Sequence, residues 1–378
     1  MTEVKLSKAS IDKIKAFLEE GVGEGVFPGA VLLVAQKGQV LFTEKSGHLS
    51  LMPERIPVKK DTIFDLASLT KPLSTTLCLM KLINEGELKL DQPLSELITT
   101  PVPSDKENLT LRQLLSHSAG FTDWKPFYLD LMSYDYEQRK GVLREQILKD
   151  SLAYSPGEEY LYSDLGFMIL EWIIEESTGM SMKQFVEQSF YEPLRLGRTF
   201  LSTVPLSMPF KKASFAATQD CPWRERIIQG EVDDENAWAL GGYSGHAGLF
   251  GSAEEVYKVV NFLREHYLGM KDDYLNPETV RTFFTRQDMV KGSDWCLGWD
   301  SRAEENSSAG RYFSRNSVGH TGFTGTSVWM DLDRDIIVIL LTNRVHPTRE
   351  NEKIKAFRPA IHDLVMEELG LVQASKVN

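Results

Sequence analysis

The two ends of this 378-residue chain carry the same two patterns in opposite order. Residues 10–20 place apolar side chains at helical spacing, and apolar runs at 30–35 and 40–43 follow around a short polar turn. Near the C-terminus two further apolar runs, 326–330 and 336–342, flank another polar turn, and residues 354–369 again have helical periodicity. This symmetry predicts one antiparallel sheet that is built from both ends of the chain and covered by the terminal helices.

Between these ends the apolar spacing is mainly helical. Helical patterns cover residues 68–85, 109–116, 141–150, 165–178 and 252–266. Ser252 and Glu255 form a capping-box signature at the start of the last pattern. We therefore predict an α+β fold, an α/β sandwich whose antiparallel sheet is flanked by the N- and C-terminal helices, with an inserted, mostly helical subdomain. Residues 1–66 and 240–378 would form the discontinuous sheet domain, residues 67–239 the helical insertion, and the active site would lie at their junction.

Composition limits the partners and the compartment. With 54 acidic and 42 basic residues the formal net charge is −12, which disfavours nucleic acid and anionic membranes as partners. The N-terminus lacks an apolar run after its charges, and no stretch approaches the roughly 18 apolar residues of a membrane span. We expect a soluble cytoplasmic protein, with export left open if a leader has been trimmed. Cys78, Cys221 and Cys296 lie far apart and favour buried reduced thiols. The oligomeric state is not determined by the sequence.

Catalytic chemistry is first indicated at Ser68 and Lys71, which form a Ser-x-x-Lys motif. On a helix the two side chains share a face, with Cβ atoms roughly 5–6 Å apart, so a partly neutral lysine can take the serine proton. Chance produces about one such motif in a chain of this length. Ser10 with Lys13 is another example, in an amphipathic surface helix where Ser10 is expected to cap the helix or face solvent. Spacing alone therefore does not identify a catalytic pair.

Two later segments supply the context for that pair. Tyr162-Ser163-Asp164 lies in a turn-rich stretch before the helix at 165–178, and His320-Thr321-Gly322 opens the C-terminal hairpin. Together with Ser68-x-x-Lys71 they resemble, in order and spacing, the motifs of the class C β-lactamase and penicillin-binding-protein family of serine hydrolases, which includes esterases and D-amino-acid peptidases. Matching stretches at 86–94, 114–121, 245–250 and 297–299 extend the resemblance over nearly the whole chain.

The resemblance implies a β-lactamase/transpeptidase-like fold and an acyl-enzyme mechanism. Ser68 would be the nucleophile, Lys71 its base, and Tyr162 the phenol that relays a proton to the leaving group. The third motif would line the substrate cleft, with the N–H of Phe323 and the N–H of Ser68 forming an oxyanion hole. Gly322 would let substrate approach the strand closely. No cofactor and no catalytic metal are expected.

Two residues depart from the family pattern and bear on the substrate. His320 replaces the usual lysine, and we expect a neutral ring that donates a hydrogen bond but attracts anions less than lysine does. Asp164 replaces the usual asparagine. If ionised, Asp164 would raise the pKa of Lys71 and oppose its role as base, unless the carboxyl is protonated or turned away. Together with Thr321, these residues would form a substrate site shifted towards negative charge.

A small-molecule ester, amide or lactam is therefore the expected class of substrate. β-Lactams and peptidoglycan stem peptides carry a carboxylate near the reacting carbonyl, and this site should accept them less well than neutral or amine-bearing esters and amides. An esterase-like hydrolase is the favoured function. A β-lactamase, a D,D-peptidase or D-aminopeptidase, and a non-catalytic penicillin-binding-like ligand binder remain the alternatives.

Most of the remaining conspicuous residues are expected to have structural roles. Residues 229–236 form an acidic segment, expected as a solvated loop, with a cation-binding cleft rim as the alternative. His117 and His246 are expected to be hydrogen-bonded structural histidines, since no metal-ligand spacing accompanies them. A minority of Trp124, Trp223, Trp238, Trp295 and Trp299 would line an acyl pocket. Gly242-Tyr243-Ser244-Gly245 does not match a nucleophile elbow, and Arg195, where the family tends to have glycine, has no interpretation from sequence.

Overall fold

The computed structural model of the chain describes residues 6–205 and 210–372. The helices are α1 (Lys8–Gly23), η1 (Ala67–Leu69), η2 (Lys71–Thr75), α2 (Thr76–Asn84), α3 (Leu94–Leu97), α4 (Leu111–Leu115), α5 (Tyr128–Leu131), α6 (Tyr136–Lys149), α7 (Asp164–Thr178), α8 (Met182–Val186), η3 (Glu187–Tyr191), η4 (Lys212–Ser214), α9 (Glu235–Ala239), α10 (Ala253–Tyr267), α11 (Pro277–Phe284) and α12 (Ile354–Glu368). The strands are β1 (Gly29–Gln36), β2 (Gln39–Ser50), β3 (Ile56–Pro57), β4 (Phe64–Asp65), β5 (Phe200–Leu201), β6 (Asp220–Cys221), β7 (Arg226–Ile227), β8 (Leu249–Gly251), β9 (Asp300–Ser301), β10 (Ser317–Thr321), β11 (Ser327–Asp331) and β12 (Ile336–Thr342).

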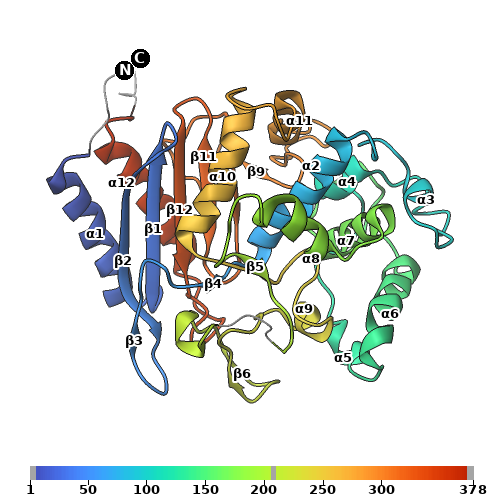
Figure 1. Ribbon diagram of the computed structural model, residues 1–378, viewed down its shortest axis with the longest axis horizontal. Coiled ribbons are helices and arrows are strands. Elements are labelled where there is room, and N and C mark those ends of the chain that lie inside the picture. Colours follow the sequence, from blue (N-terminus) through green and yellow to red (C-terminus); the bar gives the residue numbers. More distant parts are fainter. Residues whose placement is uncertain (1–5, 206–209, 373–378) are drawn as a thin grey trace.

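Both ends of the chain contribute to one sheet, as the sequence predicts. Its strand order is β3-β2-β1-β12-β11-β10-β9, and every neighbouring pair is antiparallel. The first and last long strands lie side by side at its centre, where Ala30 pairs with Thr342 and Gln36 with Ile336 (Figure 1). The strands of this sheet fall within residues 29–57 and 300–342. The domain limits at 66 and 240 stay a prediction.

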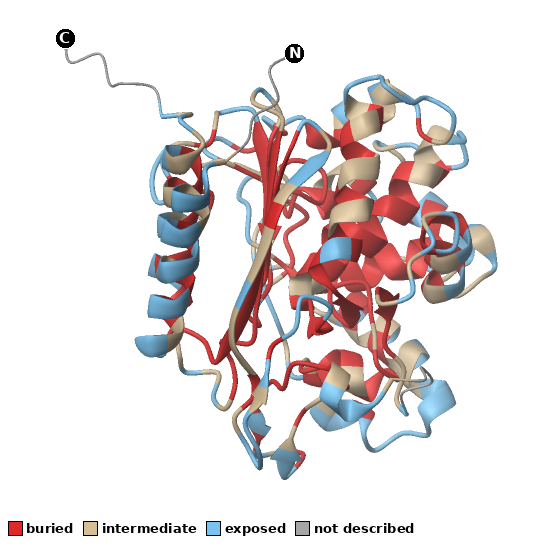
Figure 2. Ribbon diagram, turned by 60° about the vertical axis from the view of Figure 1, so that its left-hand side comes forward, coloured by how far each residue is buried: buried red, intermediate tan, exposed pale blue. Residues whose placement is uncertain are grey.

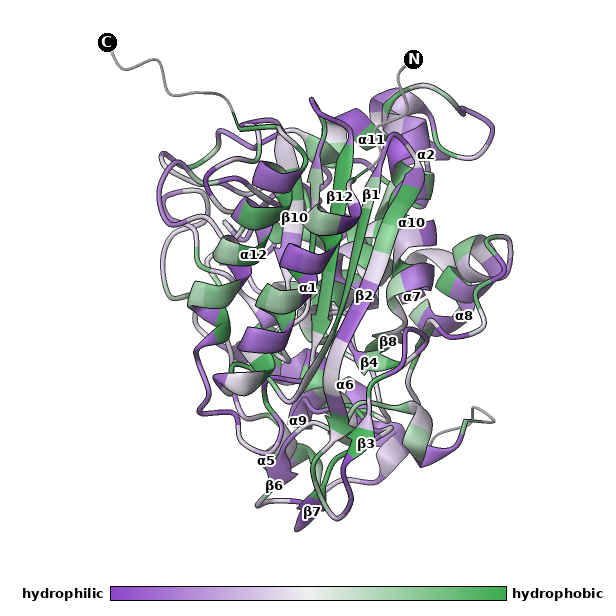
Figure 3. Cartoon of the chain, turned by 90° about the vertical axis from the view of Figure 1, so that its left-hand side faces the viewer, coloured by the Kyte–Doolittle hydropathy of each residue, from purple (hydrophilic) through white to green (hydrophobic). Residues whose placement is uncertain are grey.

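The two faces of the sheet are covered by different helices. On β1 and β12, one set of alternating side chains, which includes Leu32 and Leu340, packs against α1 and α12. The other set, which includes Leu33 and Ile339, packs against α10 and the helical region. Figure 2 shows the terminal helices on one side of the buried sheet, with their exposed faces outward, and Figure 3 shows the apolar strands behind them. Strands buried on both faces explain the nearly continuous apolar runs in the sequence.

Most predicted helices are confirmed, with two local corrections. The patterns at 109–116, 141–150, 165–178 and 252–266 correspond to α4, α6, α7 and α10. The segment after Ser68 is not one α-helix: η1 is a 3₁₀ turn, η2 is a π-helix, and α2 begins only at Thr76. Pro72 lacks an N–H, so the carbonyl of Ser68 cannot receive its usual bond from residue 72. Within the described residues no helix is both long and apolar enough to span a bilayer.

The predicted capping box of α10 is wrong. The side chain of Ser252 makes no capping bond. The carboxylate of Glu255 instead accepts from the N–H groups of Gly197 at 2.9 Å and Arg198 at 2.6 Å. The capping box requires the Glu255 carboxylate as an acceptor at the start of α10, but this carboxylate is bound to residues that are distant in sequence. This contact fixes the loop that leads into β5, which with β4 and β8 forms a small sheet next to Ser68.

Candidate active site

A cleft of about 730 Å³ gathers almost all of the predicted site residues. Ser68, Tyr162, Asp164 and residues 320–323 line it. Ser68 lies in η1, and Tyr162 and Asp164 lie in the loop before α7 and in its first turn. Residues 320–323 lie at the end of β10 and in the turn that follows. Lys71 lies beneath the surface of the cleft and is fully buried. The three sequence motifs, separated by up to about 250 residues, are thus brought together in one place.

The backbone before Ser68 is held in an unusual conformation by Asp65. Ala67 has a φ of +48°, in the left-handed region that residues with a side chain rarely adopt. The buried carboxylate of Asp65 accepts from the N–H of Ala67 at 2.9 Å and from the N–H of Asp233 at 2.7 Å. Burial, with help from Asp233, raises the pKa of Asp65 to about 7. Sequence reasoning missed Asp65, although an Asp two residues before a turn N–H is a known local signal.

Lys71 lies at the centre of the site. Its Nζ donates to Ser68 Oγ at 3.1 Å, to Tyr162 OH at 2.6 Å and to Asp164 Oδ1 at 2.6 Å, with the carbonyl of His246 farther away at 3.4 Å. Burial alone would lower the pKa of Lys71, but Asp164 and then Tyr162 outweigh it and raise that pKa above its ordinary value. Asp164 is therefore not turned away, and Lys71 rests as an ammonium.

Tyr162 and Asp164 are presented by the start of α7. Ser163 caps this helix by accepting from the N–H of Gly166, and Asp164 is its first residue, where the helix dipole favours a carboxylate. The N–H of Ser163 donates to Nδ1 of His117 at 3.0 Å, so this histidine is structural, as expected. Burial raises the pKa of Tyr162, and the charge of Lys71 offsets this increase only in part. The phenol therefore keeps its proton at neutral pH.

His320 is neutral, as predicted, but its free nitrogen has the opposite polarity. Burial, and next the charge of Lys71, lower the pKa of His320 to about 3. Its Nδ1 lies 2.9 Å from the carbonyl of Thr321, which can only accept, so Nδ1 carries the proton and Nε2 presents a lone pair. His320 does donate a hydrogen bond, as expected, but the acceptor is the carbonyl of Thr321 within the protein. Position 320 thus carries no cation where a lysine would, and its Nε2 is buried without a hydrogen-bond partner.

Gly322 is required by packing inside the protein. A Cβ at this position would lie 2.6 Å from the carbonyl oxygen of Leu66 and closer still to Oγ1 of Thr326. The turn after β10 lies directly against the segment before Ser68, held by Thr324 Oγ1 to Asp65 O at 2.7 Å and Thr326 Oγ1 to Leu66 O at 3.1 Å. The glycine thus sets the distance between the two walls of the site. The predicted reason, close approach of substrate, does not account for these contacts.

A family model described as Beta-lactamase matches residues 14–361. The chain belongs to the β-lactamase family.

Relatives of this β-lactamase-family chain extend over most of its length. An N-acetylmuramyl-L-alanine amidase of Bacillus subtilis (strain 168) is 30% identical over 373 residues, 90% of this chain and 82% of its own. A protein of Escherichia coli (strain K12), provisionally assigned as a D-alanyl-D-alanine carboxypeptidase, is 31% identical, over 91% of this chain and 84% of its own. The solved structure of EstCE1, a hydrolase with promiscuous acyltransferase activity, has a TM-score of 0.74 at 23% identity, over 95% and 98% of the two chains. The chain is thus a serine hydrolase with a β-lactamase/transpeptidase-like fold.

In this β-lactamase-family site, the acidic segment 229–236 is not a solvated loop. Asp233 and Glu235 are buried and both pair with Arg349 at 2.8 Å, and they line the cleft together with Asp234. Asp234 Oδ1 lies 3.0 Å from Nε2 of His246. Burial would raise the pKa of Asp234, but His246 lowers it to about 2. Residues 233–235 of the segment are instead part of the cleft wall.

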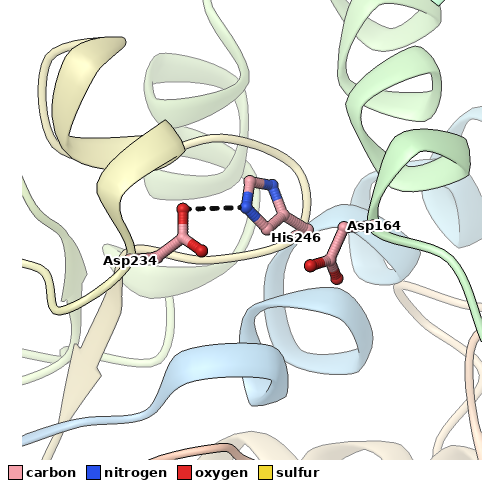
Figure 4. A group of neighbouring side chains, drawn as sticks. All are labelled: Asp164, Asp234 and His246. Atoms are coloured by element: carbon pink, nitrogen blue, oxygen red, sulfur yellow. Dashed lines mark hydrogen bonds and ion pairs between the residues drawn. The ribbon is translucent and has the colours of Figure 1, made fainter. Parts of the chain in front are cut away.

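Asp164, Asp234 and His246 lie within 4.8 Å of one another and could together hold a metal ion (Figure 4). The ammonium of Lys71 already binds Asp164 at 2.6 Å, and its charge opposes a second cation there. Figure 4 also shows the His246 ring turned towards Asp234. These contacts favour an internal ion-pair network, so we assign no metal to them.

The structure also shows the positions of the tryptophans and of Ser244, Ser10 and Arg195. Trp124 and Trp295 line the cleft, whereas Trp223, Trp238 and Trp299 do not. Ser244 is fully buried and donates to Glu171 at 2.6 Å, so it is no nucleophile. Ser7, not Ser10, caps α1. Arg195 adopts a φ of +54° just after η3, a left-handed position where glycine is common, which explains the family preference.

Proposed function

We propose that the chain hydrolyses esters or amides through an acyl-enzyme formed on Ser68. The observation that carries this proposal is the position of Lys71 Nζ, within 3.1 Å of Ser68 Oγ and 2.6 Å of Tyr162 OH. The three N–H donors of an ammonium match Ser68, Tyr162 and Asp164 as acceptors. A proton can pass along the short bond from Lys71 to Asp164, and Lys71 then becomes the amine that a base requires.

The steps follow from these contacts. Lys71 takes the proton of Ser68 as Oγ attacks the carbonyl carbon, and the carbonyl electron pair moves to its oxygen. That oxyanion is held by the N–H groups of Ser68 and Phe323. Among the described residues no group accepts from the N–H of Phe323. The carbonyl re-forms and expels the leaving group, which takes a proton from Tyr162, and Lys71 restores that proton. Water then attacks the acyl-enzyme with the same groups, and the acid and Ser68 are released.

The polar lining of the cleft favours neutral or amine-bearing groups next to the reacting carbonyl. Position 320 carries a neutral ring in place of a cation, and the carboxyl groups of Asp164, which contacts Lys71, and Asp234 line the cleft. A β-lactam fixes its carboxylate close to the carbonyl, where it would meet these acceptors. We therefore propose an esterase-like or amidase-like hydrolase with weak β-lactamase activity.

The names of the two curated relatives support a second candidate within the same chemistry. The Bacillus subtilis protein is named an amidase for an N-acetylmuramyl-L-alanine bond, and the Escherichia coli protein is provisionally named a D,D-carboxypeptidase. Amide bonds of peptidoglycan fragments are therefore the alternative substrates. A muramyl-peptide and a D-alanyl-D-alanine peptide belong in the substrate panel for this reason.

A single panel tests these possibilities. p-Nitrophenyl esters of several acyl lengths, D- and L-aminoacyl p-nitroanilides, the two peptidoglycan fragments and nitrocefin are assayed with wild type and with Ser68→Ala. We expect turnover of esters or amides that Ser68→Ala abolishes, and slow nitrocefin hydrolysis. Nitrocefin turnover rivalling that of the esters would overturn the substrate preference. Stable labelling of Ser68 by a fluorophosphonate, without turnover of any substrate, would identify a ligand binder instead.

A further inference from the structure

Two arginines of the cleft lining, Arg344 and Arg358, lack the ion-pair partners that their neighbour Arg349 has. Arg344 follows β12 and Arg358 lies in α12, and each side chain lines the cleft although each residue is only 7% exposed. The neighbouring Arg349 has two carboxylate partners, Asp233 and Glu235. Among the ion pairs of residues 6–205 and 210–372, none includes Arg344 or Arg358.

The hydrogen bonds of the pair use only part of its capacity. Arg344 donates to the carbonyls of Phe323 at 2.8 Å, Arg349 at 2.9 Å and Asn351 at 2.7 Å. Arg358 makes one bond, from Nη2 to the carbonyl of Thr326 at 3.3 Å, and its Nε is buried without a partner. A guanidinium carries five N–H donors, so most donors of Arg358 have no acceptor among the residues that the structure describes.

This arrangement is electrostatically unfavourable without a ligand. A buried charge needs a partner of opposite sign, and here a second positive charge lies nearby. Burial, and then the charge of Arg344, lower the pKa of Arg358 to about 10. Burial also lowers the pKa of Arg344, and the charges of Glu352 and Asp233 offset that decrease only in part. Paired guanidinium groups match the planar oxygens of carboxylates and phosphates, which accept two parallel bonds.

The location of the pair would place a bound anion in the same cleft as Ser68. Both arginines bind carbonyls of residues 323–326, the turn after β10 that carries the N–H of Phe323. The same cleft is lined by Asp164, which binds Lys71, and by Asp234, so its lining holds carboxyl groups as well as the two arginines without ion-pair partners. A substrate with an anionic group at one end only would bind in one orientation.

We propose that Arg344 and Arg358 bind an oxyanion, a carboxylate or a phosphate, at the end of the substrate that is remote from Lys71. This inference rests on the proposed function and specifies its substrate class: an ester or amide with a terminal anion several bonds from the carbonyl. It differs from the carboxylate of a β-lactam, which is fixed close to the reacting bond and would lie near His320.

The kinetic test compares two esters of matched length. Mono-4-nitrophenyl glutarate carries a terminal carboxylate and 4-nitrophenyl valerate does not. We expect wild type to favour the glutarate ester, and Arg358→Met to reduce the ratio of the two kcat/KM values about 10- to 100-fold. Arg358→Lys should recover part of the ratio. Arg315→Met is the matched control, because Arg315 is 76% exposed and pairs with Glu304 on the surface. An unchanged ratio in Arg358→Met, or an equal loss with both esters, would overturn the proposal.

Binding without turnover separates this inference from the proposed function. Calorimetry on Ser68→Ala with glutarate, inorganic phosphate and neutral glutaramide measures the arginine site alone. Binding of either anion, without binding of glutaramide, supports the site if adding Arg358→Met abolishes it. Comparison of glutarate with phosphate shows whether the site prefers a carboxylate or a phosphate. Failure of both anions to bind overturns it. If Arg358→Met does not fold, competitive inhibition of wild-type valerate turnover by glutarate, with glutaramide inactive, decides the question.

Discussion

The contact between the turn after β10 and the segment before Ser68 predicts a large effect for Gly322→Ala. The added Cβ would lie 2.6 Å from the carbonyl oxygen of Leu66, whereas an ordinary carbon–oxygen contact needs about 3.3 Å. The turn must therefore retreat by about 0.7 Å, the difference between these two distances. The same retreat would stretch the bonds from Thr326 and Thr324, now 3.1 Å and 2.7 Å, to about 3.8 Å and 3.4 Å, beyond or at the edge of hydrogen-bond range.

These distances set the magnitude of the loss. Two weakened bonds at about 1 kcal/mol each, with about 1–3 kcal/mol for overpacking, give a destabilisation of about 3–5 kcal/mol. The N–H of Phe323 would move with the turn, and losing one oxyanion donor costs about 10²–10³ in rate. Chemical unfolding followed by circular dichroism measures the destabilisation, and ester kcat/KM measures the loss of rate.

A matched control separates this contact from a general effect of adding a methyl group. Gly141 lies inside α6, and a Cβ there meets nothing within 4 Å. Gly141→Ala should raise stability by about 0.5–1 kcal/mol and leave kcat/KM unchanged. If Gly322→Ala kept both its stability and its ester kcat/KM at the wild-type level, the argument that Gly322 spaces the two walls of the site would be refuted.

Three further predictions concern charge. Asp164→Asn removes the carboxylate that raises the pKa of Lys71, so the acid limb of the ester kcat/KM profile should move to lower pH; an unmoved limb would exclude Lys71 as the titrating base. His320→Lys should raise the ratio of nitrocefin to ester turnover about tenfold, and no change would show that position 320 does not meet the lactam carboxylate. Asp65 has a raised folded-state pKa of about 7, so its ionisation should weaken wild-type stability as pH rises from about 4 to 7; the wild-type melting temperature should fall more than that of Asp65→Asn, and parallel curves would contradict this.

The parts of the fold that repeat a local pattern were predictable. The hairpins at both ends and α4, α6, α7 and α10 follow from apolar spacing, because each buries one face or a whole strand. The capping box at Ser252 failed since Glu255 is used by Gly197 and Arg198, more than fifty residues away. The π-helix after Ser68 also escaped prediction, although Pro72 was visible in the sequence.

The site shows the same division. The order of the motifs was enough to predict that Ser68, Lys71 and Tyr162 share one cleft. The proton position on His320 depends on a single carbonyl contact, and the role of Gly322 depends on Leu66, 256 positions earlier in numbering. Asp65 and the Arg344–Arg358 pair gain their meaning from neighbours that only the folded chain supplies. Long-range contacts of this kind leave no pattern in a single sequence.

The pairing of β1 with β12 has a consequence for biosynthesis. Every residue of β1 is buried, yet its partner strand lies about three hundred residues later in the chain. At about 5–20 residues per second, a ribosome needs roughly 15–60 s to make the stretch between them. During that time the hairpin of β1 and β2 can exist without its partner, its apolar faces accessible to other nascent chains and to chaperones. The segments between the two strands, which include Ser68, Lys71 and Tyr162, are therefore synthesised before the sheet can close.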